Sequence, residues 1–227
     1  MRIYDTGLPR PLTARNLWNW AYYNKTDSVM YAAAETARLG TVSRQAKWSE
    51  TKTPSKSPGF SDNSRQVWVE TQKQVVRGII NKLSPELKSL GNMLYMPDQD
   101  VRKIDINRTI NTIRIASLEK IDKKHASKVI ALHDIVLMRY WDSISSAIEG
   151  GTPKSMEVSG SEVKSFFNIH GRNIDTRYWQ REYSPVWAEI INIIRDLDRQ
   201  ALRPLDEFIN SHFDKLARLE EEAQHEY

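Results

Sequence analysis

Two long helical patterns dominate the second half of the chain and limit what it can fold into. They span residues 125–144 and 184–202. In both, large apolar side chains recur at steps of three and four residues over much of the helix circumference, which predicts helices buried on most sides. The second pattern opens with Ser184 and Pro185, a cap residue and a proline at the first helical position. Together they predict an all-α protein with a substantial core.

Most of the remaining chain also shows helical patterns, which predicts a multi-helix bundle with a C-terminal helix. In one of these helices, Ile104, Arg108 and Ile115 follow a single line. Nine glycines and nine prolines among 227 residues are few for a turn-rich all-β protein. The further helices are expected over residues 13–22, 28–39, 65–82, 84–96, 101–118, 161–170 and 173–182.

Residues 41–64 differ from the rest because Ser, Thr, Lys and Pro dominate and no periodicity persists. Such a segment cannot bury enough apolar surface to offset its ordering entropy, so we expect a flexible arm. The position of this arm predicts that the chain divides into an N-terminal helical segment (1–40), an arm (41–64) and a main helical domain (65–227). The arm either lies along a phosphate backbone or serves only as a tether.

The charge is unevenly distributed along the chain. Residues 1–128 hold 22 basic and 12 acidic side chains, a net of +10, whereas residues 129–227 hold 11 and 17, a net of −6. A basic half is typical of a protein with a polyanionic partner, and the acidic half would then meet a protein partner. Ordinary solvated faces are the alternative explanation for this imbalance.

Particular basic side chains are candidate contacts to nucleic acid. On a continuous helix, Lys120, Lys124 and Lys128 would share one face at four-residue spacing and could follow phosphates. The predicted contacts are Arg44, Lys47, Lys52, Lys56, Arg102, Lys103, Lys120, Lys124, Lys128, Arg172, Arg177 and Arg181.

Residues 161–182 have the outline of a helix, a glycine-containing turn and a second helix, which is the general form of a DNA-reading unit. The bulky Phe166 and Phe167 disfavour the close helix packing of such a unit. Tyr178 and Trp179 are therefore expected to lie in the core beneath the long helices.

Past Arg203 and Pro204, the last segment has apolar or neutral residues at alternating four- and three-residue steps, which is typical of a short coiled-coil seam. It can pack against the body of the protein or against a second copy of the chain. The seam consists of Leu205, Ile209, His212, Leu216, Leu219 and Ala223.

No pattern in the chain predicts an enzyme. The five histidines form no ligand pair on one helix, and phosphate-binding and nucleophile motifs are missing. We therefore expect no cofactor, no metal and no catalytic residue. With no cysteine, no apolar run long enough to span a membrane and no signal-peptide pattern, the chain is expected in the cytoplasm.

The chain as a whole is helical, basic and free of cysteine, and it has an acidic end. It contains the stretches LSPELKSLGNMLYMPD (83–98) and DTRYWQREYSPVW (175–187). In this general character the chain resembles bacteriophage accessory DNA-binding proteins of the small terminase subunit or late antiterminator kind. Antiterminators of the lambda type carry cysteine pairs that bind zinc, and this chain departs from that pattern. The resemblance implies a role in transcription regulation or DNA packaging.

The sequence thus favours a non-enzymatic nucleic-acid-binding protein with a basic N-terminal half. The alternative is a helical structural or adaptor protein that acts through protein–protein assembly, including self-association.

Overall fold

α-Helices make up most of the part of the chain that the structure describes. The computed structural model describes residues 12–23, 62–97, 100–148, 151–169 and 175–225. This part of the chain is 83% helical, contains no strand and has seven α-helices packed together, which confirms the all-α multi-helix bundle. The helices are α1 (Ala14–Tyr22), α3 (Asp62–Asn81), α4 (Pro85–Tyr95), α5 (Lys103–Lys120), α6 (Ala126–Ile148), α7 (Gly160–Ile169) and α8 (Ser184–His225).

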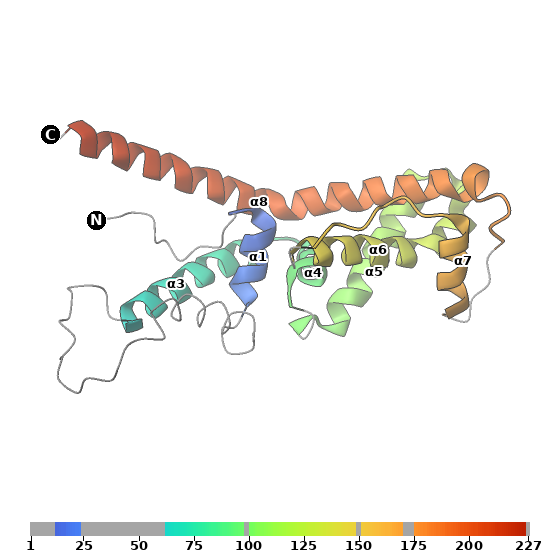
Figure 1. The fold of residues 1–227 in the computed structure, drawn as a ribbon, viewed down its shortest axis with the longest axis horizontal. Helices are drawn as coiled ribbons and strands as arrows, with labels where there is room; N and C mark the ends of the chain where they lie inside the picture. The colour runs from blue at the N-terminus through green and yellow to red at the C-terminus, as the bar shows by residue number, and fades with distance from the viewer. Residues whose placement is uncertain (1–11, 24–61, 98–99, 149–150, 170–174, 226–227) are drawn as a thin grey trace, which may run out of the picture.

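The longest helix, α8, runs along the whole body, and α1, α4, α5 and α6 pack against it (Figure 1). Its 42 residues correspond to a length of about 63 Å. Pro204 lies inside α8, so the separation of a last segment at this proline is wrong. A proline removes one backbone hydrogen bond, but the buried Leu202 and Leu205 on either side keep the helix packed on the body.

Local capping sets the starts of α1 and α4 as expected. The backbone N–H of Asn16 donates to Thr13 Oγ1 over 3.2 Å, and that of Leu87 donates to Ser84 Oγ over 3.4 Å. Both cap hydroxyls satisfy a donor that has no partner within its helix. α3 begins at Asp62, three residues before the expected start, so the expected arm overlaps this helix.

The first helix belongs to the same core as the main domain. Leu17 and Trp18 of α1 are fully buried, together with Leu90 and Tyr95 of α4 and Ile190 of α8. A division of the chain at residue 40 therefore does not separate α1 from the packed body. The predicted helix over residues 28–39 and the arm up to residue 61 lie outside the described residues.

The single helix that was predicted to carry Lys120, Lys124 and Lys128 on one face is interrupted between α5 and α6. α5 ends at Lys120, Ile121 is extended, and a single 3₁₀ turn over Lys123–His125 precedes α6. The side chain of Asp122 accepts the backbone N–H of Lys124 over 3.1 Å and caps this turn. Lys120, Lys124 and Lys128 therefore lie on three separate elements, and the predicted lysine stripe on one helix is wrong.

The predicted helix over residues 173–182 is also wrong in part. Residues 175–178 form no helix, and a π-helical turn, Trp179–Tyr183, leads directly into α8. Trp179 is buried as expected, and its indole N–H donates to the carbonyl of Val158 over 3.1 Å. Tyr178 was expected in the core but is 55% exposed, because the irregular backbone turns it outward.

A buried carboxylate ties four helices together at the centre of the body. Asp198 of α8 is 2% exposed and accepts hydrogen bonds from the hydroxyls of Tyr95 and Tyr140, the latter over 2.8 Å. Arg15 of α1 completes the cluster, with Nη2 3.1 Å from Asp198 Oδ2. Burial, followed by the negative charge of Asp198, raises the pKa of both tyrosines, so both hydroxyls stay protonated and donate.

Candidate nucleic-acid interface

Most of the basic residues that were predicted to contact nucleic acid, and that the structure describes, form ion pairs with carboxylates. Arg44, Lys47, Lys52, Lys56 and Arg172 lie outside the described residues. Of the seven others, six form an ion pair with an acidic neighbour. The pairs are Arg102–Asp105 (2.9 Å), Lys120–Asp196 (4.0 Å), Lys124–Asp122 (3.1 Å), Lys128–Glu182 (2.9 Å), Arg177–Asp175 (2.7 Å) and Arg181–Glu182 (3.0 Å).

These pairs differ in how firmly they hold the basic group. Lys128 is 19% exposed and also lies over the ring of Tyr183, 5.5 Å from its centroid. Arg177 is 80% exposed, and its hydrogen bonds, followed by its charge, lower the pKa of Asp175 to about 2. Asp175 is therefore anionic at neutral pH and offsets the charge of Arg177. Exposed pairs of this kind contribute little to stability, so they can open to a competing anion.

The exposed side of α5 has a different character, and we call it the α5 face. It consists of the exposed Lys103, Ile104, Asn107, Asn111, Arg114 and Ile115 and the half-buried Arg108. Lys103 and Arg114 are exposed and have no ion-pair or hydrogen-bond partner within the described part of the chain. Ile104 is 55% exposed and Ile115 is 53% exposed. The α5 face therefore presents free positive charge, side-chain amides and aliphatic groups together.

The helical period orders these side chains around α5. At about 100° per residue, Lys103 and Arg114 project within about 20° of one another, and Arg108 lies about 140° from Lys103. The two asparagines and two isoleucines fall between these basic edges. Glu119, at the C-terminal end of the helix, is the acidic residue exposed on this side. The centre of the α5 face is thus uncharged. One edge is basic, and the other carries Arg108 with Glu119 about 20° beyond it near the end of the helix.

A buried polar contact fixes which side of α5 faces outward. Asp105 is 2% exposed and accepts a hydrogen bond from Ser89 of α4 over 2.8 Å and from Arg102 Nε over 2.9 Å. Burial alone would raise the pKa of Asp105, but the hydrogen bonds from Arg102 and Ser89 outweigh it and lower the pKa. Asp105 therefore stays anionic and holds α5 against α4.

The inward row of α5 consists of Asp105, Thr109, Ile113 and Ser117, all buried. Ile104, Arg108 and Ile115 do share one side of α5, as the sequence pattern predicts, but this side faces outward and both isoleucines are more than half exposed. The α5 face was missed because isoleucines occur on both sides of α5, so apolar periodicity does not select one. No pattern in the sequence marks the inward row, because Asp105, Thr109 and Ser117 are polar and periodicity alone would place them outward.

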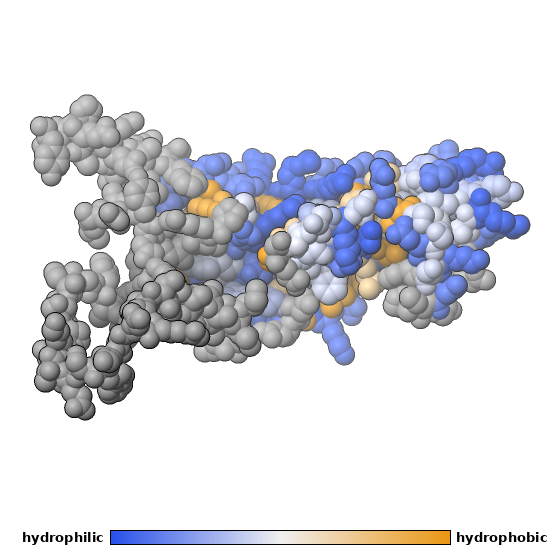
Figure 2. All heavy atoms as spheres, in the orientation of Figure 1, coloured by the Kyte–Doolittle hydropathy of each residue, from blue (hydrophilic) through white to orange (hydrophobic). Residues whose placement is uncertain are grey.

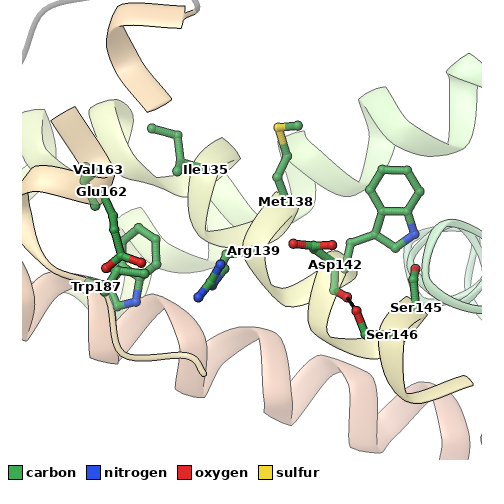
Figure 3. Close-up of a pocket in the computed structure, with 11 residues that line it drawn as sticks. Ile135, Met138, Arg139, Asp142, Ser145, Ser146, Glu162, Val163 and Trp187 are labelled. Atoms are coloured by element: carbon green, nitrogen blue, oxygen red, sulfur yellow. Dashed lines mark hydrogen bonds between the residues drawn. The ribbon is translucent and has the colours of Figure 1, made fainter. Parts of the chain in front are cut away.

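The structure also contains a cavity of about 470 Å³ between α6, α7 and α8. Figure 3 shows Arg139 and Asp142 of α6, Glu162 of α7 and Trp187 of α8 around it. Arg139 Nε donates to the carbonyl of Ser155 over 2.9 Å, and Lys154 pairs with Asp142 over 2.6 Å. These charged groups therefore hold the segment that connects α6 to α7.

The face of the molecule shown in Figure 2 is largely hydrophilic, with hydrophobic residues visible in separate patches. Within the described ranges, no group of three or more His, Asp or Glu side chains is placed to hold a metal ion. In the same ranges, no helix is long and apolar enough to cross a membrane. The chain matches no protein-family model, no curated protein and no solved structure.

Proposed function

We propose that the protein binds nucleic acid without catalysing a reaction, and that the α5 face is the contact surface. The observation that carries the proposal is the pair of unpartnered cations, Lys103 and Arg114, on one edge of a rigidly held helix. Phosphate contacts by such cations release counterions, which drives binding. The net charge of +10 over residues 1–128 supports the same partner, because it draws a polyanion toward this half of the chain.

Removing the two free cations should weaken binding at every nucleic-acid sequence. For Lys103→Ala combined with Arg114→Ala, we expect the slope of log K against log salt to become shallower by about 2, one for each lost phosphate contact. Fluorescence anisotropy with a labelled duplex at a series of salt concentrations measures this slope.

The matched control removes the same net charge from α8. Arg199 and Arg203 are exposed on α8, outside the α5 face, so Arg199→Ala combined with Arg203→Ala should keep the wild-type slope. Wild-type protein that binds no duplex, single strand or RNA at low salt would refute the proposed function. An equal loss in both double variants would show that overall charge, and not the α5 face, governs binding.

Assembly through α8 is the second candidate function, and one observation favours it. Ile209 is the last buried side chain described on α8, yet the helix continues to His225 and extends past α1 in Figure 1. Leu205 and Ile209 of the predicted seam are buried in the body, and the remaining seam positions from His212 to Ala223 continue along this extension at coiled-coil spacing. A second copy of the chain, or a protein partner of the acidic half, would then cover it.

Light scattering tests this second function. We expect the wild-type mass to rise toward that of a dimer with concentration, and Leu216→Asp combined with Leu219→Asp to remain monomeric. Lys215→Asp, which lies beside the seam, serves as the control and should still dimerise. A wild-type monomer at every concentration would exclude self-association through α8.

A further inference from the structure

We infer that the α5 face enters the major groove of duplex DNA and reads a short site containing A·T pairs. This inference rests on the proposed function and makes it specific: it names the nucleic acid, the groove and the bases. It follows from the order of chemical groups across the α5 face and from the way α5 is held.

Duplex DNA fits the α5 face better than other nucleic acids do. The major groove of B-DNA is wide enough to admit an α-helix, whereas that of A-form RNA is deep and narrow. Proteins that bind single strands stack bases on aromatic side chains, and the α5 face has none. An exposed helix with aliphatic and amide groups at its centre therefore matches a paired, B-form target.

The layout of charge on α5 matches the layout of a groove. In a duplex the phosphates lie along both sides of the groove and the base edges form its floor. Lys103 and Arg114 on one edge of the α5 face, and Arg108 on the other, would face the two phosphate strands. Asn107 and Asn111 lie between these edges and would face the bases.

The uncharged centre of the α5 face carries groups suited to adenine and thymine. An asparagine amide can donate to N7 and accept from N6 of adenine, which distinguishes an A·T pair in the major groove. Exposed aliphatic side chains can pack against the thymine methyl group. Ile104 and Ile115 provide such side chains at the two ends of the α5 face. The two isoleucines are about 16 Å apart along the axis, which corresponds to roughly five base pairs.

The buried contacts of α5 keep this arrangement fixed before DNA arrives. Asp105 bonds to Ser89 over 2.8 Å, and Arg108 Nη1 donates to the same hydroxyl over 3.3 Å. Arg108 is therefore held at its edge of the face, and α5 cannot rotate about its axis without breaking both contacts. A helix that is already oriented loses little conformational entropy on binding.

The test begins with selection from a pool of random-sequence duplexes, which should enrich a site with adjacent A·T pairs. Deoxyuridine in place of each thymidine of the selected site then removes only the methyl group. We expect affinity to fall roughly fourfold at a contacted thymine, the effect of losing one buried methyl. Replacement of adenine by 7-deazaadenine at a contacted position should reduce affinity by roughly tenfold.

Variants of the α5 face assign each effect to a side chain. Ile104→Ala and Ile115→Ala should each lose sensitivity to one deoxyuridine position, and Asn107→Ala and Asn111→Ala should each lose sensitivity to one 7-deazaadenine position. Ile130→Ala is the matched control, because Ile130 is 53% exposed on α6 and outside the α5 face. This control should keep every base preference of the wild type.

The outcomes separate this inference from the proposed function. Salt-dependent binding with no enriched site, or with equal affinity for thymidine and deoxyuridine duplexes, would overturn groove reading and leave nucleic-acid binding intact. Tighter binding to single strands or RNA than to the selected duplex would also overturn it. Absence of binding to any nucleic acid would refute both.

Discussion

Gly91→Ala should lower the free energy of unfolding by about 2–3 kcal/mol, since overpacking a filled core forces neighbours from their preferred positions. A Cβ at Gly91 of α4 would lie 2.1 Å from the Trp18 ring. The indole cannot move aside, because Trp18 is fully buried and packs on Tyr95 with ring centroids 5.9 Å apart. Urea denaturation followed by circular dichroism measures the loss.

Gly78→Ala is the matched control for this effect. Gly78 also lies within a helix, α3, but a Cβ there meets no atom within 4 Å. Alanine should therefore raise stability by about 0.5–1 kcal/mol through its higher helix propensity. If both variants were equally stable, the close contact between Gly91 and Trp18 would be contradicted.

Asp198→Ala should destabilise the protein by about 3–5 kcal/mol, the range found when one partner of a buried ionic cluster is removed. Two buried hydroxyls, those of Tyr95 and Tyr140, would lose their acceptor, and Arg15 would lose its counter-charge. A double-mutant cycle with Tyr140→Phe should show a coupling energy of about 0.5–3 kcal/mol, because both residues act in one network.

The neighbouring Asp196 provides the control for Asp198. Its side chain is 47% exposed and pairs with Arg199 and Lys120 at the surface. Asp196→Ala should change the free energy of unfolding by less than about 1 kcal/mol. Thermal unfolding of both variants at pH 7 distinguishes them, and a similar small effect for Asp198→Ala would mean that the cluster contributes little to stability.

The sequence predicted the fold class and most helix starts because those depend on local and periodic signals. Thr13 and Ser84 act as caps in the structure, and the long helices appear where apolar residues recur at helical spacing. Pro204 was misjudged because its cost is offset by packing of α8 on other helices. Local propensity does not reveal such tertiary compensation.

The candidate site was predicted only in part. Lys103 belongs to the α5 face, whereas Arg102, the residue just before α5, is paired with Asp105. Whether a basic side chain is free depends on which carboxylate folding brings beside it, as Asp196 is brought to Lys120 and Glu182 to Lys128. Charge counting along the chain does not contain this information. The α5 face emerges only when the buried contacts of Asp105 are known.

The position of Asp198 in the chain also bears on how the protein is made. Its partner Arg15 precedes it by 183 residues, so a ribosome adding about 5–20 residues per second takes roughly 10–40 seconds between the two. Until Asp198 is made, α1 is without the anion that anchors it, and the hydroxyls of Tyr95 and Tyr140, once synthesised, are without their acceptor. The nascent chain can therefore complete its core only after most of α8 has left the exit tunnel.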